Sequence, residues 1–278
     1  MPSHRVSYDL AEAPLASGEV AIIGAGPGDP GLLTLRALSL IEQADCLVYD
    51  RLVSREVLAL ASPRARRFYV GKASRCHALT QDETNALLVR LSREGRRVVR
   101  LKGGDPYIFG RGGEEAEVLI EHGVSFRVVP GITSAQGCAA YGGFPLTHRD
   151  HAQSVTFVTG HCKGDGDLAL NWASLAAPNQ TTVFYMGLAN AELIRGELQR
   201  HGLPASHPVA LVERGTTPEQ RRVITCLGEL VETIASEGLK PPTLIVVGEV
   251  VRLADTLSQP VPEQAAFIEG AVLERVAL

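Results

Sequence analysis

The 278-residue sequence lacks the features that mark membrane, secreted and disulfide-rich proteins. No apolar run approaches the roughly 20 consecutive residues that cross a membrane, and residues 1–17 contain no apolar signal segment. The five cysteines form no CxxC pair, and the neighbours Cys76-His77 and His161-Cys162 have no partners at metal-binding spacing. We therefore expect a cytoplasmic protein that has no metal site and does not associate with membranes.

An excess of positive charge is also absent. The chain has 27 Lys and Arg residues against 31 Asp and Glu residues, which gives a formal net charge of −4. Such a chain has no overall field that attracts nucleic acid, so we expect no nucleic-acid partner. An anionic ligand would have to be bound by a local cluster of basic side chains.

What the sequence does contain is two series of short apolar runs that alternate with helical patterns. In the first series, runs rich in β-branched residues occupy 19–23, 45–49, 96–102 and 126–130, and helical patterns occupy 31–44, 80–95 and 114–123. In the second series, the runs occupy 154–160, 181–187, 208–214, 221–226 and 243–249, and helical patterns occupy 191–202 and 229–238. Strands that alternate with helices predict an α/β fold with helices on both faces of each sheet.

The two series predict two α/β domains with mainly parallel or mixed sheets. A segment rich in glycine and proline separates them, with one short helical piece inside it. The expected organisation is an N-terminal domain over 18–130, a linker over 131–150, a C-terminal domain over 151–256, and tails at 1–17 and 257–278.

The first apolar run leads into the glycine-rich segment GAGPGDPG at 24–31. A strand that ends in such a turn and enters a helix presents backbone N–H groups to a ligand. The dinucleotide fingerprint requires a third glycine where this chain has Asp29, and Pro27 removes an N–H donor. Both residues disfavour a phosphate and suit a polar or cationic ligand. Pro30 fits the first helical turn, with Asp29 as its N-cap.

Asp50 supports an alternative interpretation. It ends the second apolar run, about 20 residues after Gly28, and the ribose-binding acid of NAD proteins has this spacing. A nicotinamide-dependent dehydrogenase is therefore a second hypothesis for the chain.

The second glycine-rich segment, VVRLKGGDPYIFGRGGEE at 98–115, is longer and more unusual. A strand runs into Gly-Gly-Asp-Pro, and an aromatic patch and Gly-Arg-Gly-Gly follow before a helix. The segment is not a phosphate-binding Walker loop, because no Gly-Lys-Ser/Thr closes it. Glu114 and Glu115 open the helix, where its dipole favours carboxylates, so helix capping is the simplest role for both, above all for Glu115.

Together these segments resemble the uroporphyrinogen-III C-methyltransferases of the tetrapyrrole methylase superfamily. The matching segments are GAGPGDPGLLTLRA (24–37), YDRLVS (49–54), VRLKGGDPYIFGRGGEE (99–115), VPGITSA (129–135), PLTHRD (145–150), VTGH (158–161), FYMG (184–187) and VERGTTPEQR (212–221). GRGGEE, THRD and ERGTTPEQ favour this family over the later precorrin methylases, which share mainly the two glycine loops. The resemblance implies two α/β domains with the active site in the cleft between them.

The resemblance also implies the reaction and its cofactor. The family transfers methyl groups from S-adenosylmethionine to two pyrrole carbons of uroporphyrinogen III, at positions 2 and 7. The substrate becomes precorrin-2 via precorrin-1, and the cofactor becomes S-adenosylhomocysteine. A sulfonium cofactor without phosphate is compatible with the first glycine loop. The implied cofactor-binding residues are Pro27, Gly103, Gly104, Asp105, Ile108, Thr133, Ser134, Met186 and Gly215. For Met186, filling of the core is the alternative role.

For catalysis, the resemblance suggests Asp50 as proton acceptor and Lys72 as proton donor, with Arg111 and Glu114 as a competing choice. Because the pKa of arginine exceeds about 12, we expect an electrostatic role for Arg111. The reaction needs the carbon and the methyl group in line and a proton removed, and it requires no metal. A substrate rich in carboxylates implies a basic lining, for which the candidates are Arg51, Lys102, Arg149, His161 and Arg214.

Other expectations follow from the same resemblance. The family is typically homodimeric, and its product serves cobalamin, sirohaem and haem d1 synthesis. The chain as given carries no attached dehydrogenase or ferrochelatase domain, so we expect it to perform methylation alone. A later precorrin methyltransferase, the nicotinamide-dependent dehydrogenase and a non-catalytic tetrapyrrole carrier are the alternative hypotheses.

Overall fold

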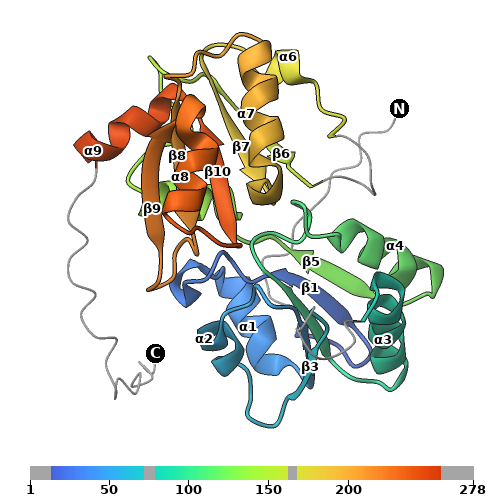
Figure 1. The fold of residues 1–278 in the computed structure, drawn as a ribbon. Coiled ribbons are helices and arrows are strands. Elements are labelled where there is room, and N and C mark those ends of the chain that lie inside the picture. The colour runs from blue at the N-terminus through green and yellow to red at the C-terminus, as the bar shows by residue number, and fades with distance from the viewer. Residues whose placement is uncertain (1–13, 72–78, 162–167, 258–278) are drawn as a thin grey trace, which may run out of the picture.

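The computed structural model describes residues 14–71, 79–161 and 168–257, which form two lobes, each built around a five-stranded sheet (Figure 1). The N-terminal lobe contains β1 (Val20–Gly24), η1 (Pro30–Leu32), α1 (Leu35–Gln43), β2 (Cys46–Tyr49), α2 (Arg55–Ala59), β3 (Arg66–Tyr69), α3 (Gln81–Arg93), β4 (Val98–Lys102), α4 (Gly112–Glu121) and β5 (Phe126–Val129). Within the described part of the chain, no helix combines the length and apolarity that crossing a membrane requires.

The first sheet has the strand order β3-β2-β4-β1-β5, and every pair in it is parallel. Side chains from alternate positions enter two separate cores, as a strand buried on both faces requires. Ala21 and Ile23 pack with α1 and α2, whereas Val20 and Ile22 pack with α3 and α4. The predicted α/β architecture is thereby confirmed for this lobe.

The strand order places the two glycine loops side by side. β1 and β4 are neighbours, but the chain leaves β1 towards β2 on one side and leaves β4 towards β5 on the other. Neighbouring strands whose connections diverge in this way leave a gap at their carboxyl ends, where open α/β sheets bind ligands. Residues 25–31 follow β1 and residues 103–111 follow β4, so both glycine loops lie at this switch point.

Local signals in the sequence determine where several of these helices begin and end. Asp29 caps η1 by accepting a hydrogen bond from Gly31 N, and Pro30 occupies the first position, as predicted. Thr80 and Glu83 form a capping box at the start of α3. Gly95 and Gly123, which follow α3 and α4, have left-handed φ angles of 73° and 66° and so end the helices as expected.

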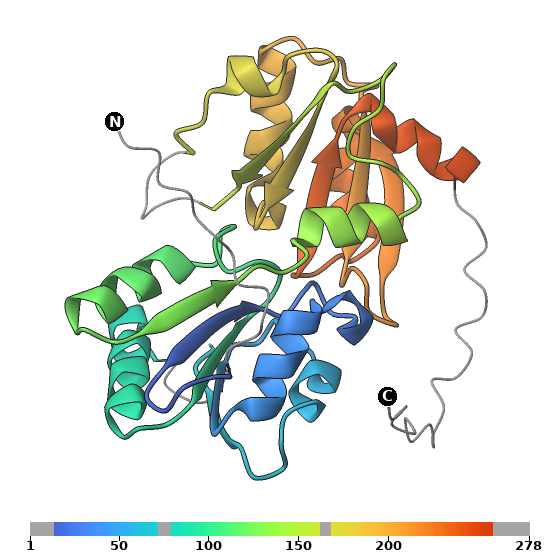
Figure 2. The same cartoon turned by 180° about the vertical axis from the view of Figure 1, so that it is seen from behind.

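The C-terminal lobe contains a mixed sheet of order β6-β7-β10-β8-β9, in which only β6 and β7 are parallel. Its elements are α5 (Ser134–Tyr141), β6 (Ser154–Thr159), α6 (Trp172–Leu175), β7 (Gln180–Tyr185), η2 (Leu188–Asn190), α7 (Ala191–Arg200), β8 (Pro208–Glu213), β9 (Arg221–Cys226), η3 (Leu227–Glu229), α8 (Leu230–Ser236), β10 (Thr243–Val247), η4 (Glu249–Leu253) and α9 (Ala254–Leu257). Helices α6, α7 and α8 cover one face of the sheet. Helix α5, yellow-green in Figure 2, lies with η4 on the other.

Strand β3 and the predicted linker differ from the sequence-based expectation. Strand β3 has no counterpart among the predicted runs, because its residues RRFY are largely exposed at the sheet edge and form no apolar run. The segment expected to be a linker supplies core residues to the C-terminal lobe. Ala135, Cys138 and Phe144 are buried against Val183 and Val212 of the second sheet.

Candidate functional site

The two glycine loops are joined to each other through their backbones. Gly26 N donates to Gly104 O at 3.2 Å, and Gly104 N donates to Gly26 O at 2.7 Å. A third glycine closes the same contact, because a Cβ on Gly131 would lie 2.4 Å from Gly104 O. Side chains cannot be accommodated at such distances. The glycines in these motifs therefore allow three backbone segments to meet at the carboxyl ends of β1, β4 and β5.

The carboxylates of both loops accept hydrogen bonds within the protein. Asp29 Oδ1 accepts from Gly31 N at 2.6 Å and Oδ2 accepts from Tyr141 Oη at 2.5 Å. Asp105 accepts from Tyr107 N at 2.8 Å and from Gly131 N at 3.0 Å. The sequence-based interpretation gave these charges a role towards a cationic ligand. The geometry shows that they also shape the loops, and their role towards a ligand remains a prediction.

The first loop is also poor in N–H groups that could bind phosphate. Ala25 N donates to Lys102 O at 2.8 Å, Asp29 N donates to Thr216 Oγ1 at 3.2 Å, and Gly26 N is used in the contact with the second loop. Pro27 has no N–H to offer. Because a pyrophosphate depends on such donors, this arrangement disfavours the dehydrogenase hypothesis.

The C-terminal lobe meets these loops through Tyr185. Its hydroxyl shares a hydrogen bond of 2.6 Å with Thr133 Oγ1 and accepts one from Ala135 N at 3.0 Å, at the start of α5. Its ring centroid lies 4.9 Å from that of Phe109 in the second glycine loop. Burial raises the pKa of the Tyr185 hydroxyl above its ordinary value. The two glycine loops and the start of α5 meet residues 185–187 and 214–217 in one region. We call this region the lobe junction.

Backbone strain is concentrated beside the lobe junction. Five of the six described non-glycine residues with positive φ lie in its motif segments, namely Phe109, Arg111, Met186, Arg214 and Thr216. Such conformations cost free energy and are concentrated at functional sites. The side chain of Met186 is 52% exposed, so it does not fill the core. Exposure and strain together support a ligand-facing role for Met186.

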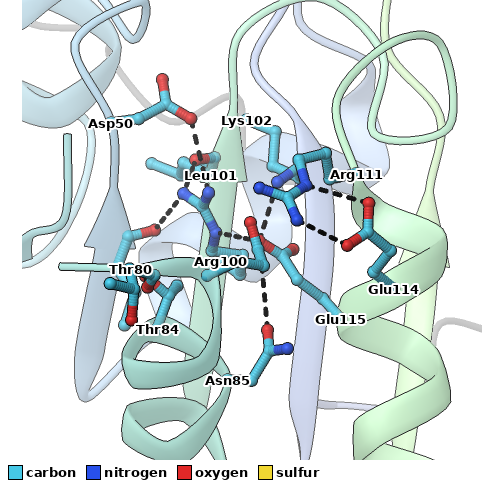
Figure 3. Close-up of polar contacts among 12 residues, drawn as sticks. Asp50, Thr80, Thr84, Asn85, Arg100, Leu101, Lys102, Arg111, Glu114 and Glu115 are labelled. Carbon is cyan, nitrogen blue, oxygen red and sulfur yellow. Dashed lines mark hydrogen bonds and ion pairs between the residues drawn. The ribbon is translucent and has the colours of Figure 1, made fainter. Parts of the chain in front are cut away.

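A buried cluster of charges lies beneath the second loop (Figure 3). Glu115 Oε1 accepts a hydrogen bond from Arg100 Nε at 3.0 Å and from Lys102 Nζ at 2.8 Å. On its other side, Arg100 Nη2 lies 3.4 Å from Asp50 Oδ2. Burial and the charge of Arg100 lower the pKa of Lys102, and Glu115 opposes this effect. The cluster therefore links Asp50, at the end of β2, to helix α4.

The alternation of β4 explains this cluster. Val98, Arg100 and Lys102 share the face that α3 and α4 cover, while Val99 and Leu101 face α1. The sequence contains a signal for this cluster, because Arg100 and Lys102 alternate along a buried strand and a helix with Glu115 follows. Arg100 could have been identified from this pattern. Lys102, expected at the substrate, has its ammonium in this buried cluster. Glu115 does more than cap its helix, since it is fully buried and holds two cations.

Arg111 and Glu114 lie together at the start of α4, outside the buried cluster. Arg111 Nε and Nη2 donate to the two oxygens of Glu114 at 2.9 and 2.6 Å, and both side chains are about half exposed. The hydrogen bond to Glu114 raises the pKa of Arg111 above its ordinary value. A proton-accepting role for Arg111 is therefore disfavoured, and its electrostatic role remains a prediction.

The other candidate residues are less constrained by their surroundings. Those expected to bind substrate and found exposed are Arg51, Arg149, His161 and Arg214. Lys72 lies outside the described residues, as do Cys76, His77 and Cys162.

A groove of about 570 Å³ between α3 and α4, lined by residues such as Asn85, Val118 and His122, contains none of the candidates. The lobe junction, and not this groove, brings the sequence motifs together.

A comparison with protein families settles the class of the chain. A family model for the Tetrapyrrole (Corrin/Porphyrin) Methylases matches residues 19–231. The chain belongs to this family. The match confirms the predicted fold and an S-adenosylmethionine-dependent methylase. It includes both glycine loops, Met186 and residues 214–217, so the lobe junction lies within the matched region.

Similar curated proteins and solved structures give further detail. The siroheme synthase of Azotobacter vinelandii is 59% identical over 246 residues, which cover 88% of this chain and 53% of that protein. That of Methylococcus capsulatus is 58% identical over 262 residues, covering 92% and 55%. The chain thus spans about half the length of these relatives.

Two solved methyltransferase structures share the fold of this chain. The uroporphyrin-III C-methyl transferase of Thermus thermophilus, complexed with S-adenyl homocysteine, has a TM-score of 0.73 and 43% identity, covering 85% of this chain and 94% of its own. A cobalt precorrin-4 methyltransferase has a TM-score of 0.76 and 28% identity, covering 84% and 96%. The fold alone therefore does not distinguish between these two methylases.

Proposed function

We propose that the chain methylates uroporphyrinogen III at carbons 2 and 7 and gives precorrin-2 via precorrin-1. One observation carries the proposal: the glycine loops, joined at Gly26 and Gly104, meet Thr133 and Tyr185 at a single lobe junction. Higher identity to the uroporphyrin-III enzyme, 43% against 28%, supports this substrate over that of a later precorrin methyltransferase.

The lobe junction suits S-adenosylmethionine better than a nucleotide with phosphates. The loop carboxylates and several N–H groups are already hydrogen-bonded, and the exposed Met186 offers an apolar surface. The residues that we propose to hold the cofactor are Pro27, Gly103, Gly104, Asp105, Ile108, Thr133, Ser134, Met186 and Gly215. When bound, the cofactor supplies an electrophilic methyl group on a sulfonium centre.

We propose that Asp50 accepts the proton that the macrocycle releases after methylation. A carbon–carbon bond forms as the carbon–sulfur bond of the methyl donor breaks, and the positively charged macrocycle that results then loses a proton from a position other than the methylated carbon. Asp50 Oδ1 accepts a hydrogen bond from Leu52 N at 3.0 Å, and Arg100 lies on the Oδ2 side. These contacts fix the carboxylate at the end of β2. Lys72 remains the proposed proton donor.

The side chains proposed to bind the substrate carboxylates are basic and mostly exposed. They are Arg51, Arg111, Arg149, His161 and Arg214, with Glu114 orienting Arg111. Lys102 contributes positive charge from the buried cluster. Guanidinium groups suit this role because they bind carboxylates with two parallel hydrogen bonds.

The test is an anaerobic assay with uroporphyrinogen III and S-adenosylmethionine, followed by mass spectrometry of the product. We expect two methyl groups to be added by the wild-type chain and none by Asp50→Asn, with S-adenosylhomocysteine bound by both. Binding without any methylation by the wild type would favour a tetrapyrrole carrier. Methylation of a later precorrin alone would favour the alternative enzyme.

A homodimer is the assembly that we propose from the same family resemblance. Light scattering during size-exclusion chromatography would measure its mass. A monomer across the working concentration range would contradict the proposal.

A further inference from the structure

Asp29 connects the two lobes as well as capping its own turn. From the N-terminal lobe, its Oδ2 accepts a hydrogen bond from Tyr141 Oη at 2.5 Å, at the end of α5. Its backbone N donates to Thr216 Oγ1 at 3.2 Å, in the segment after β8. One residue of the first glycine loop thus contacts two separate segments that pack with the second sheet.

Those two segments are also bound to each other. Gln220 Oε1 accepts from Thr216 N at 2.7 Å, and Gln220 Nε2 donates to Tyr141 O at 3.0 Å. Thr216 is buried, and its φ of 64° is unfavourable for a β-branched residue. Since strain of this kind persists only where surrounding contacts hold it, the hydrogen bonds of Gln220 and Asp29 explain the conformation of Thr216.

The contact between the lobes has no spare space. A Cβ on Gly137 of α5 would lie 2.5 Å from Pro27 Cγ, and one on Gly28 would lie 2.7 Å from Thr217 Cγ2. The first loop is therefore pressed against α5 on one side and against residues 216–217 on the other. Loosening the hydrogen bonds of Asp29 would therefore weaken the attachment of this loop to the second lobe.

The position of Asp29 connects these contacts to the cofactor. Pro27 lies two residues before Asp29, and Gly215 directly precedes Thr216, so the proposed cofactor residues flank the inter-lobe contact on both sides. We propose that Asp29, Tyr141, Thr216 and Gln220 form an inter-lobe latch, and that Asp29 is a positioning residue that fixes Pro27 relative to Gly215. This inference rests on the proposed function, because it assigns the cofactor to the lobe junction.

The latch has a thermodynamic consequence for cofactor binding. A site that is already assembled loses less conformational freedom when its ligand binds, and therefore binds more tightly. Opening the latch would remove none of the residues that contact the cofactor. Cofactor binding would then have to restore the relative positions of these residues. The expected effect is thus on affinity, with catalysis at saturating cofactor retained.

The experiment compares Tyr141→Phe, Thr216→Val and the double variant with the wild type. Calorimetric titration with S-adenosylhomocysteine should show each single change weakening binding about five- to tenfold. The double variant should lose less than the product of the two effects, because both contacts hold the same loop. In the methylation assay, KM for S-adenosylmethionine should rise while kcat changes little.

Two controls distinguish the latch from a general loss of stability. Glu232→Gln disrupts a surface ion pair with Arg195 and should leave S-adenosylhomocysteine affinity unchanged. Thermal unfolding of every variant tests the fold, and a variant with lower Tm but unchanged affinity would show a merely structural contact and overturn the latch. A wild type that does not bind S-adenosylhomocysteine would instead overturn the cofactor assignment itself.

Discussion

Lys102 Nζ donates a hydrogen bond of 2.8 Å to Glu115 Oε1, and both side chains are almost completely buried. A buried pair of this kind contributes less to stability than its short distance suggests, because both groups have lost their hydration. Removal of one partner is different, since the remaining charge is buried without compensation. In this protein Glu115 faces two cations, so its removal takes the carboxylate partner from Lys102 and leaves Arg100 with the more distant carboxylate of Asp50.

Glu115→Ala should therefore lower the free energy of unfolding by about 3–5 kcal/mol. The double variant Lys102→Met, Glu115→Leu should lose less, because an apolar pair of similar volume replaces two of the three charges. Urea unfolding followed by circular dichroism measures both. A Glu115→Ala variant as stable as the wild type would show that the charges of the cluster are hydrated.

Gly131→Ala tests the close contact of the glycine loops. The new Cβ would lie 2.4 Å from Gly104 O, and because the obstacle is backbone, the loops must separate. We expect a loss of about 1–3 kcal/mol in stability and weaker binding of S-adenosylhomocysteine. Gly113→Ala in α4 is the matched control, since its Cβ would meet nothing within 4 Å and alanine favours a helix. Equal behaviour of the two variants would contradict the contact.

The sequence predicts the fold better than it predicts the chemical roles of single residues. All five strands of the C-terminal lobe and four of the five in the first lobe coincide with runs rich in β-branched residues. Such residues favour strands that are buried on both faces, as β8 and β10 are, and also strands that are partly exposed, as β6 and β9 are. Strand β3, exposed and charged, gives no such signal.

The candidate site was identified from motifs, but the partners of its side chains depend on tertiary contacts. The partner of Asp29, Tyr141, lies 112 positions away in sequence, and no local pattern links them. Arg100 is an intermediate case. Strand alternation predicts the face of the sheet on which Arg100 lies, but it does not predict the contact of Arg100 with Asp50. The roles of Asp50, Arg111 and the basic side chains stay predictions, which the assays above test.

The contact between Tyr141 and Asp29 should be sensitive to high pH. The hydrogen bond to Asp29 raises the pKa of Tyr141 to about 12, above the value of about 10 for an unfolded chain. The folded state thus holds this proton more tightly, and the contribution to stability is present below about pH 10 and lost as pH rises through about 12. The stability difference between wild type and Tyr141→Phe should stay constant below about pH 10 and shrink above it. A difference that does not change with pH would contradict this assignment.

Met186→Ala separates ligand binding from core packing. The side chain is 52% exposed, so its truncation should change Tm little, whereas truncation of a buried side chain such as Leu211 should lower Tm strongly. We expect S-adenosylhomocysteine to bind at least several-fold more weakly to Met186→Ala, because an apolar contact surface is lost. Calorimetric titration and thermal unfolding measure the two effects. A large fall in Tm with unchanged affinity would restore the role of core filling.

Arg111→Ala should abolish most turnover and leave binding of S-adenosylhomocysteine intact. Arg111 pairs with Glu114 on an exposed surface, so its removal should change stability by less than about 1 kcal/mol. Its backbone already has a φ of 60°, and alanine meets the same strain as arginine there. Because the pairing with Glu114 raises the pKa of Arg111, we attribute the expected loss to substrate carboxylates that are no longer held.

Arg111→Lys distinguishes charge from shape, since lysine keeps the charge but cannot form two parallel hydrogen bonds. Recovery of turnover in that variant would assign the effect to charge alone, and unchanged turnover in Arg111→Ala would remove the residue from the site.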